Sequence, residues 1–307
     1  MPPLPGTDLT VSSLCLGGNV FGWTADEPTS FAVLDRYVDA TPSPVRAFVD
    51  TAESYGNGAS ERILGAWMAS RGNRDEVVVA TKASRTGKEH PLAAAEIRSA
   101  AERSLRNLRV DTIDLYYAHW DDPTTPLEET LRAFDELVQA GKVRYVAASN
   151  YTAQRLTEAL ETSDRLGVAR FGALQTHYNL MERDAFEAGL RDVAAAEGLG
   201  VLPYYALAKG FLTGKYRQGE RVDSPRAEGA AAYLGERGDR VLAALRAVAD
   251  EHAVPVPAVA LRWLADRPTV VAPIASGRNV EQLADLLPMQ DLVLTEDERQ
   301  VLDDASA

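Results

Sequence analysis

Short apolar runs alternate with amphipathic segments along almost the whole chain. The runs are rich in Val, Tyr and Ile, and several are apolar at nearly every position, which is typical of strands buried on both faces of a parallel sheet. The predicted strands are residues 11–18, 46–51, 76–82, 112–119, 143–150, 172–179, 200–207 and 269–276. Strands that alternate with helices imply parallel pairing through crossover helices, and eight such units predict an α/β fold, the (β/α)8 or TIM barrel.

The segments between the runs have the pattern of helices. Residues 60–68 predict an amphipathic helix with Ser60 as its N-cap. Residues 91–108 and 126–143 each begin with a proline, which is favoured in the first turn of a helix. This regular alternation has no linker that divides it into domains.

The length of the chain fits this interpretation. It has 307 residues, of which 46% are hydrophobic and 25% are charged, values that argue against disorder. One barrel needs about 250 residues plus insertions, so residues 1–307 are expected to form a single barrel domain. The alternation is interrupted once, by a stretch rich in Gly and charge at about 208–240. It is either a surface insertion or, as we expect, a functional loop after the seventh strand.

Charge and cysteine content narrow the class of partner. The net charge of −13 argues against a nucleic acid or an anionic membrane as partner, although a local basic cluster can still bind an anionic cofactor. The single cysteine, Cys15, allows no internal disulfide, which suits a reducing compartment. The first residues, MPPLPGTDLT, lack the pattern of a signal peptide, and no apolar stretch reaches the length of a membrane span. We therefore expect a cytoplasmic protein.

Ionisable side chains occur where three successive predicted strands end. Asp50 ends the second, with Tyr55 in the following turn; Lys82 ends the third and His119 the fourth. Each alone has an ordinary structural explanation, such as a turn cap, a surface charge or a buried histidine. Together they are expected to converge, because the carboxyl ends of all barrel strands open onto one face, where barrel active sites lie.

These four side chains can move a proton. A phenol has an ordinary pKa of about 10, and a nearby ammonium lowers it by favouring the phenolate. Lys82 can supply that charge, Asp50 can orient Lys82, and His119 can bind a substrate oxygen or assist proton movement. Tyr55 can then protonate a developing alkoxide. Neither HExxH nor CxxC spacing occurs, so we expect no metal site.

A proton donor without a strong nucleophile suggests that a cofactor supplies the other reagent, with hydride as the natural candidate. The dinucleotide motif GxGxxG is absent, but other residues suit such a cofactor. The amide and hydroxyl groups of Ser149, Asn150 and Gln175 suit a carboxamide, and Tyr204 offers a ring for stacking. The basic residues suited to phosphates are Lys209, Lys215, Arg226 and Arg278.

An ordered series of segments resembles the aldo-keto reductase family over nearly the whole chain. The segments are FVDTAESYGNGASERILGAW, VVVATK, DTIDLYYAHWDD, GKVRYVAASNY, ALQTHYNLMER, YYALAKGFLTGKYR and IASGRNVEQLADL. The resemblance implies a barrel that binds NADP(H) extended across its C-terminal face and reduces aldehyde or ketone carbonyls. It also implies a catalytic tetrad of Asp50, Tyr55, Lys82 and His119, with Tyr55 as general acid.

The resemblance assigns further residues to the cofactor. Ser149, Asn150 and Gln175 would hold the carboxamide, and Tyr204 would stack on the nicotinamide. The seventh-strand loop would contribute Leu207, Lys209, Lys215 and Arg226. The adenosine end would be addressed by Ser276, Arg278, Gln282 and Asp285, with Arg278 near the 2′-phosphate favouring NADP over NAD. Tyr205 stands where the family commonly has a small serine.

Two tryptophans are further candidates for the site, and two other functions remain as alternatives. Trp23 and Trp120 follow the first and fourth strands and either line an apolar substrate pocket or pack in the core. Lys82 at a strand end would also suit a Schiff-base lyase. Potassium-channel β subunits resemble the same family, so an NADPH-binding regulatory or sensor subunit with little turnover is the other alternative. The sequence does not identify the small-molecule carbonyl or alcohol substrate, the reaction direction or the oligomeric state.

Overall fold

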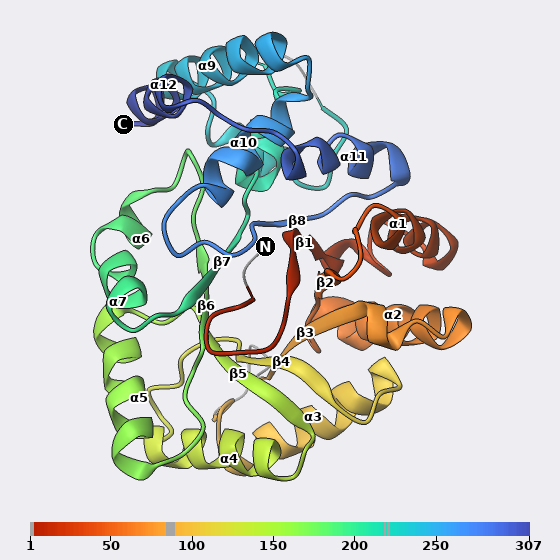
Figure 1. Ribbon diagram of the computed structural model, residues 1–307, viewed down its shortest axis with the longest axis vertical. Helices are drawn as coiled ribbons and strands as arrows, with labels where there is room; N and C mark the ends of the chain where they lie inside the picture. The colour runs from red at the N-terminus through yellow and green to blue at the C-terminus, as the bar shows by residue number, and fades with distance from the viewer. Residues whose placement is uncertain (1–2, 84–89, 218, 220–221) are drawn as a thin grey trace.

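The computed structural model of the protein describes residues 3–83, 90–217, 219 and 222–307. Within these residues eight strands form one sheet, in the order β7-β6-β5-β4-β3-β2-β1-β8, and neighbouring strands are parallel (Figure 1). The strands are β1 (Val11–Gly17), β2 (Arg46–Asp50), β3 (Val77–Ala83), β4 (Ile113–Ala118), β5 (Val143–Ser149), β6 (Ala173–His177), β7 (Gly200–Tyr204) and β8 (Ile274–Ala275). Seven of these strands begin within one residue of the predicted start. β8 begins later than predicted and is much shorter.

Backbone hydrogen bonds join the two ends of this sheet. The Val201 N–H donates to the Thr269 carbonyl (2.8 Å), and the Val271 N–H donates to the Val201 carbonyl (2.9 Å). The segment before β8 thus pairs with β7, while β8 itself pairs with β1. The result is a nearly closed barrel, and the predicted (β/α)8 fold is confirmed.

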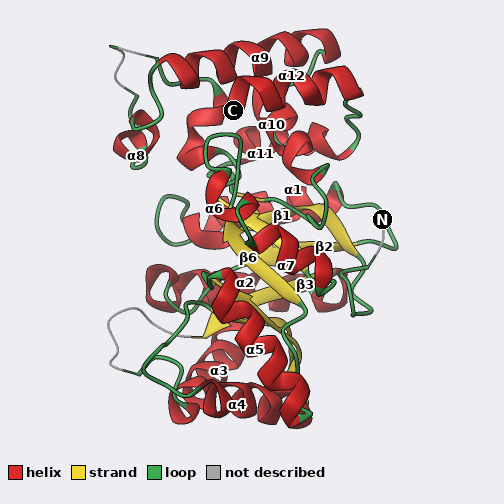
Figure 2. Cartoon of the chain, turned by 90° about the vertical axis from the view of Figure 1, so that its left-hand side faces the viewer, coloured by secondary structure: helices red, strands yellow, loops and turns green. Residues whose placement is uncertain are grey.

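Helices surround the barrel and cross from one strand to the next (Figures 1 and 2). The α-helices are α1 (Glu27–Asp39), α2 (Ala59–Arg71), α3 (Ala94–Leu108), α4 (Leu127–Gln139), α5 (Ala153–Leu166), α6 (Asp184–Glu187), α7 (Leu190–Ala196), α8 (Ala227–Ala231), α9 (Glu236–His252), α10 (Val256–Ala265), α11 (Val280–Ala284) and α12 (Glu296–Ser306). The 3₁₀ helices are η1 (Gly18–Val20), η2 (Tyr55–Gly58), η3 (Arg74–Glu76), η4 (Ala208–Thr213) and η5 (Leu287–Gln290). Among the described helices, none combines the length and the apolar composition that crossing a bilayer requires.

The apolar strands supply two separate cores. On β3, Val77 and Val79 pack outward among the helices, whereas Val78 and Ala80 pack inside the barrel. Successive side chains of a strand point to opposite faces, so a strand buried on both faces is apolar at every position. The interior core also holds Cys15, which is fully buried and carries a free thiol. The continuous apolar runs of the sequence are therefore explained by burial on both sides.

Ser60 does not cap its helix, and that prediction is wrong. α2 begins after Gly58, whose φ of +81° is left-handed and suits glycine. The Ser60 hydroxyl instead donates to the Gly18 carbonyl (2.7 Å) and shares a hydrogen bond with the Thr51 hydroxyl (2.7 Å). Ser60 thus ties the turn after β2 to the turn after β1, and both turns border the candidate site.

The amino-terminal end of the barrel is closed by apolar and charged contacts. Leu4 and Leu9, from the segment before β1, are fully buried in the interior core. Asp114 on β4 is also buried, and its carboxylate accepts hydrogen bonds from Arg74 (2.7 Å) and Arg144 (3.0 Å). Arg46 forms a third ion pair with Asp114 at 3.8 Å. Three arginines thus share one buried carboxylate, and their contacts tie β2, η3 and β5 to β4.

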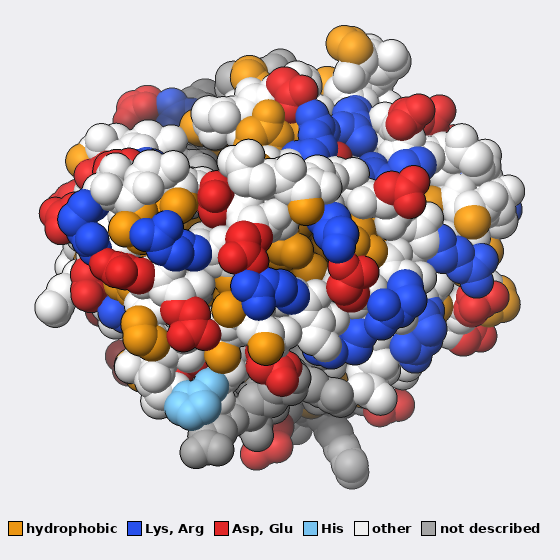
Figure 3. All heavy atoms as spheres, turned by 90° about the horizontal axis from the view of Figure 1, so that it is seen from below, with side chains coloured by type: hydrophobic (Ala, Val, Ile, Leu, Met, Phe, Trp, Pro, Cys, Tyr) orange, Lys and Arg blue, Asp and Glu red, His pale blue; other side chains and the backbone are white. Residues whose placement is uncertain are grey.

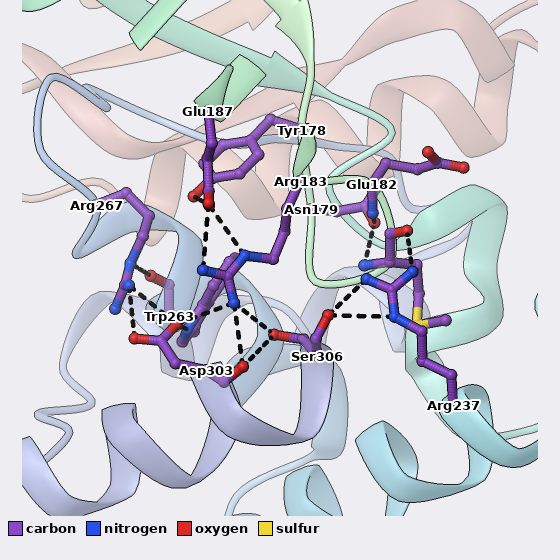
Figure 4. Close-up of polar contacts among 11 residues, drawn as sticks. Tyr178, Asn179, Glu182, Arg183, Glu187, Arg237, Trp263, Arg267, Asp303 and Ser306 are labelled. Atoms are coloured by element: carbon purple, nitrogen blue, oxygen red, sulfur yellow. Dashed lines mark hydrogen bonds and ion pairs between the residues drawn. The ribbon is translucent and has the colours of Figure 1, made fainter. Parts of the chain in front are cut away.

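An arginine cluster fixes α12 to the rest of the fold (Figure 4). Arg183, beside α6, donates to the Asp303 carbonyl (3.1 Å) and the Ser306 hydroxyl (2.9 Å). Arg237 on α9 donates to the Ser306 carbonyl (2.5 Å), and Arg267 pairs with the Asp303 carboxylate (3.0 Å). α12 packs against α9, α9 packs against α10, and α10 contacts η4. The cluster therefore supports the helical layer behind the loop that follows β7.

Acidic and basic side chains are interspersed on the face shown in Figure 3. Ion pairs cross between the helices on this side, including Arg98 with Glu136 (2.7 Å) and Arg165 with Glu128 (2.8 Å). Exposed pairs of this kind contribute little to stability. They do show that the negative net charge is not concentrated on this face.

Candidate active site at the carboxyl end of the barrel

The period of the strands carries polar side chains to the carboxyl end of the barrel interior. On β3 the interior residues Val78 and Ala80 are followed two positions later by Lys82, and on β2 Asp50 follows Phe48 in the same way. The same step places the following residues on other strands: Tyr117, Ser149, Gln175 and Tyr204. The hydrophobic interior is thus topped by a polar layer to which at least six strands contribute.

Asp50, Tyr55, Lys82 and His119 come together in this layer. The Lys82 ammonium, fully buried, donates to Asp50 Oδ2 (2.6 Å) and to the Thr51 carbonyl (2.6 Å). The ammonium nitrogen lies 5.0 Å from the centre of the Tyr55 ring. The His119 ring meets the Tyr55 ring edge-on, with centroids 6.2 Å apart. The structure therefore brings the four side chains that the sequence singled out into one cluster.

Burial and neighbouring charges oppose each other at Tyr55 and Lys82. Burial raises the pKa of Tyr55 above its ordinary value, and the charge of Lys82 with its side-chain hydrogen bond acts to lower it. Burial acts to lower the pKa of Lys82, but the Asp50 carboxylate and the Tyr55 oxygen outweigh it, so that pKa is raised. Near neutral pH the cluster thus holds a protonated phenol beside an ammonium ion.

Two amide side chains extend the cluster toward β6 and β7. Gln175 Nε2 donates to Asp50 Oδ1 (2.8 Å). Asn150 Nδ2 donates to the His119 carbonyl (2.8 Å), and Asn150 Oδ1 accepts from the Tyr204 hydroxyl (2.8 Å). These bonds fix the amides before any cofactor binds.

Ser149 lies deeper than the other residues predicted to contact a carboxamide. It is fully buried, and its hydroxyl oxygen accepts a hydrogen bond from Asn150 Nδ2 (3.0 Å). Ser149 does not line the cavity described below. Lys82 does not line it either, but its ammonium contacts Tyr55, which does. In the structure Ser149 therefore supports Asn150 from behind.

An aromatic wall stands beside the amides. The His177 ring stacks on the Tyr204 ring, with centroids 5.4 Å apart and planes 12° apart. Tyr205 meets both rings edge-on, at 5.4 Å from His177 and 5.3 Å from Tyr204. Burial lowers the pKa of His177, so its ring is neutral near pH 7. His177 thus backs the Tyr204 ring and is not itself on the cavity wall.

The chain after β7 has an unusual backbone. Tyr205, Ala208 and Lys209 have left-handed φ angles of +51°, +47° and +57°. Such angles cost non-glycine residues of order 1 kcal/mol or more and persist where other contacts impose them. One such contact is the hydrogen bond from Asn179 Nδ2 to the Tyr205 carbonyl (2.9 Å). The resulting turn directs the Lys209 ammonium over the Tyr205 ring, 5.7 Å from its centre.

Basic side chains of the loops after β7 and β8 gather along one side of the site. Lys209, Lys215, Arg226 and Arg278 all line the same cavity. Burial lowers the pKa of Arg226; three neighbouring tyrosines act against this, and the positive charge of Arg278 adds the smallest contribution to the lowering. Like charges held together in a partly buried place favour an anionic ligand, because the ligand relieves their repulsion.

The turn after β8 is tied to the turn after β1. Ser276 Oγ donates to Asn19 Oδ1 (2.8 Å), and the Arg278 N–H donates to Gln282 Oε1 (3.1 Å). A Cβ atom at Gly17 would lie 2.5 Å from Ser276 Oγ, so a larger residue there would force the Ser276 side chain to move. Asn19 was missed at the sequence level, although it follows the first strand as directly as the predicted polar residues follow theirs.

A cavity of about 580 Å³ runs along these groups. Three of the most exposed large hydrophobic side chains line it: Trp23 is 56% exposed, Trp120 is 44% exposed and Tyr205 is 39% exposed. The two tryptophans therefore face the cavity and are not core residues. The predicted site residues on its wall are Trp23, Asp50, Tyr55, His119, Trp120, Asn150, Gln175, Tyr204, Leu207, Lys209, Lys215, Arg226, Ser276, Arg278, Gln282 and Asp285.

A barrel with a phenol, an ammonium and a carboxylate at the carboxyl end of its strands defines a class of enzymes, and comparison with known proteins identifies it. The Aldo/keto reductase family profile matches residues 13–307. Norsolorinic acid reductase B of Aspergillus parasiticus is 31% identical, over 98% of this chain and 82% of that protein. Protein tas of Escherichia coli is 30% identical (96% and 94%), and the uncharacterized oxidoreductase YrpG of Bacillus subtilis is 33% identical (97% and 93%).

The chain belongs to the aldo/keto reductase family. It is accordingly an oxidoreductase that acts on carbonyl compounds, in a family whose members generally use nicotinamide cofactors.

Proposed function

We propose that the protein reduces aldehydes or ketones to alcohols with NADPH, and that Tyr55 is the general acid. The observation that carries this proposal is the buried ammonium of Lys82, fixed at 2.6 Å from Asp50 and set against the Tyr55 ring at the cavity wall. An ammonium in that place stabilises negative charge as it develops on the phenol oxygen, so the proton leaves at lower cost.

The groups along the cavity fit an extended dinucleotide. The amides of Asn150 and Gln175 and the ring of Tyr204 line the cavity and suit a nicotinamide with its carboxamide. Lys209, Lys215, Arg226 and Arg278 line the same cavity and suit phosphates. Ser276, Gln282 and Asp285 lie on the same wall as Arg278 and suit the adenosine portion.

Arg278 is the residue on which we base the preference for NADPH over NADH. It lines the cavity beside Gln282 and forms no ion pair with any described residue. A guanidinium without a partner carboxylate is free to bind a 2′-phosphate, the one group that distinguishes the two cofactors.

A nicotinamide held by these residues would supply the hydride for the carbonyl carbon. Tyr55 then donates its proton to the oxygen as that oxygen becomes an alkoxide. Lys82 stabilises the phenolate that remains, and Asp50 keeps Lys82 in place. His119, edge-on to Tyr55, is positioned to orient the carbonyl oxygen. Trp23 and Trp120 give the substrate an apolar surface.

This surface fits an apolar carbonyl compound. Trp23, Trp120 and Tyr205 line the cavity and are substantially exposed. Exposed large hydrophobic side chains are otherwise rare in the described part of the chain. Several relatives are named norsolorinic acid reductases. An apolar aldehyde or ketone is therefore the substrate class that we propose.

The test is consumption of NADPH by the purified protein with a panel of apolar and polar aldehydes and ketones. Tyr55→Phe should lower kcat by about 10²–10⁴-fold, because it removes the proton donor. Its Kd for NADPH should stay unchanged. Tyr151→Phe is the matched control, since that hydroxyl is buried outside the cavity and has no hydrogen-bond partner among the described residues.

Two results would contradict the proposal. Full activity of Tyr55→Phe would exclude Tyr55 as the acid. Tight NADPH binding without turnover on any carbonyl would favour the regulatory or sensor alternative.

A further inference from the structure

His177 is a polar residue beside the cavity that the reaction described above does not use. It ends β6, pairs with Tyr204 of β7 in the strand register, and is half-buried. Tyr204 lines the cavity, whereas His177 does not. An effect of His177 on the reaction therefore has to pass through a neighbouring side chain.

The His177 ring covers one face of the Tyr204 ring. The two ring centroids are 5.4 Å apart, and the ring planes are 12° apart. Tyr205 meets both rings edge-on, so His177 is the one ring in the described part of the chain that stacks on Tyr204. Aromatic pairs at this distance attract each other beyond the contribution of their buried area. The face of Tyr204 that a nicotinamide can use is therefore the one opposite to His177.

The hydroxyl end of the Tyr204 side chain is fixed by a different contact. The hydroxyl donates to Asn150 Oδ1 (2.8 Å), and Asn150 Nδ2 donates to the His119 carbonyl (2.8 Å). A tyrosine hydroxyl lies on the long axis of its ring, so this hydrogen bond fixes the axis but not the rotation of the ring about it. That rotation has broad preferences of its own. The stacked His177 ring is thus the contact that determines the plane of the Tyr204 ring.

Asn179, which is fully buried, fixes the His177 ring in turn. Its Oδ1 accepts hydrogen bonds from the N–H groups of Met181 (2.8 Å) and Glu182 (3.1 Å), so its nitrogen faces the other way. This nitrogen donates to the Tyr205 carbonyl (2.9 Å) and lies 3.4 Å from His177 Nε2. An amide nitrogen is only a donor, so His177 Nε2 is the acceptor and the imidazole is uncharged. One buried amide thus holds both the ring of His177 and the backbone turn at Tyr205.

We propose that His177 is a positioning residue that sets the plane of the Tyr204 ring and so aligns the nicotinamide with the carbonyl group that Tyr55 protonates. The inference rests on the proposed function, since it assigns the Tyr204 ring to the nicotinamide. Reacting atoms must be about 3–3.5 Å apart for efficient transfer. A tilt of the ring that supports the nicotinamide moves the hydride out of that range.

Three substitutions separate the ring of His177 from its hydrogen bond. His177→Phe keeps a flat ring against Tyr204 and removes the accepting nitrogen. His177→Gln keeps a side-chain acceptor for Asn179 and removes the ring. His177→Leu removes both, and it tests the ring even where His177→Gln does not fold.

Tyr178→Leu is the matched control. The Tyr178 ring belongs to the outer core, where it packs on the Phe186 ring with centroids 4.7 Å apart. It does not line the cavity. The control therefore removes an aromatic pair one residue away from His177, on the other face of the chain.

The experiment compares two ligands. NADPH carries the nicotinamide, whereas adenosine 2′,5′-bisphosphate carries only the adenosine and phosphate groups. A general loss of packing weakens the binding of both, whereas a change confined to the Tyr204 ring weakens the binding of NADPH alone. For each variant the Kd for each ligand is measured, together with kcat and KM for the best carbonyl substrate at saturating NADPH, and the melting temperature.

The two variants without a ring should behave alike. His177→Gln and His177→Leu should each raise the Kd for NADPH by about fivefold, the usual effect of losing one aromatic pair, and leave the Kd for the bisphosphate unchanged. Each should lower kcat by about tenfold without changing KM for the carbonyl, because the hydride is misaligned. His177→Phe should match the wild type in all these quantities. Tyr178→Leu should lower the melting temperature only.

Three outcomes overturn the inference. A normal Kd for NADPH and a normal kcat in the ringless variants would show that the stack has no effect on the cofactor. Equal weakening of both ligands would indicate a merely structural role. A loss in His177→Phe as large as that in His177→Gln would assign the effect to the hydrogen bond and not to the ring. If the wild-type protein does not bind NADPH, the proposed function itself fails, and this result is read before any variant is compared.

Discussion

The two ends of the barrel contain similar charged residues but pair them differently. At the amino-terminal end, three arginines share the buried carboxylate of Asp114, so each of them forms an ion pair. At the carboxyl end, Asp50 and Lys82 form one buried pair, and the adjoining cavity is lined by Arg226 and Arg278, which form no ion pair with any residue that the structure describes. Matched charges stabilise a fold, whereas unmatched ones leave binding energy for a ligand. In this barrel the first end is built for stability and the second for chemistry.

The largest effect is expected from Lys82→Met at the carboxyl end. The substitution removes the charge that favours the phenolate, so kcat should fall by at least about 100-fold. It also leaves the Asp50 carboxylate buried without its partner, at a cost of about 3–5 kcal/mol in the free energy of unfolding. Steady-state kinetics with NADPH and urea denaturation check the two parts. A variant with near-normal kcat would show that the ammonium does not assist Tyr55.

Arg278→Ala is expected to have the next largest effect. Loss of a charge-assisted contact should raise the Kd for NADPH by about 10–100-fold and leave the Kd for NADH nearly unchanged. Fluorescence titration with each cofactor measures both constants. Arg62→Ala is the matched control, since this exposed arginine lies outside the cavity. Equal weakening toward both cofactors would contradict a contact with the 2′-phosphate.

Asp114→Asn tests the opposite end of the barrel. The change removes one charge from a network of three arginines and should lower the free energy of unfolding by about 2 kcal/mol. The arginines are partly exposed, so water compensates for part of the loss. kcat and the Kd for NADPH should not change, because the carboxyl end of the barrel is untouched. A loss of activity in a folded variant would mean that the two ends are coupled.

The smallest effect is expected from changing the pH within the neutral range. Tyr55 must be protonated to donate, and its pKa is raised above 10, so the reduction rate should be flat from about pH 6 to 9. The stability that the raised pKa of Lys82 contributes is fully present below about 10.5, the ordinary lysine value, and is lost as the pH rises through the raised value. The rate from about pH 6 to 9 checks the first statement, and the melting temperature measured up to and above about pH 10.5 checks the second. A steep fall in rate near pH 7 would point to an acid other than Tyr55.

The sequence predicted the barrel well because burial on both faces gives strands a pattern that is hard to mistake. It also predicted the residues at the strand ends, since the period of a strand determines which side chains face the interior. The loops follow no such period. The left-handed turn at Tyr205 and Lys209 depends on the distant Asn179, and nothing local in the sequence encodes it.

The sequence also did not predict the positions of residues whose role depends on a contact with a distant residue. Ser149 was expected to face the cavity, but Asn150 covers it. Ser60 was expected to cap a helix, but it joins two turns from different strands. Asn19 gains its importance from its hydrogen bond with Ser276, which is far away in the chain. Such pairings depend on three-dimensional packing, which the order of polar and apolar residues does not specify.

The single cysteine of the chain can be used to measure opening of the barrel. Cys15 is fully buried in the barrel interior, two residues before the strand position that pairs with Asp50. A sulfhydryl reagent therefore reaches it only when the strands separate. The rate at which the Cys15 sulfur is labelled measures how often the barrel opens, and no additional probe has to be introduced. Slower labelling in the presence of NADPH would give the free energy by which the cofactor holds the strands closed.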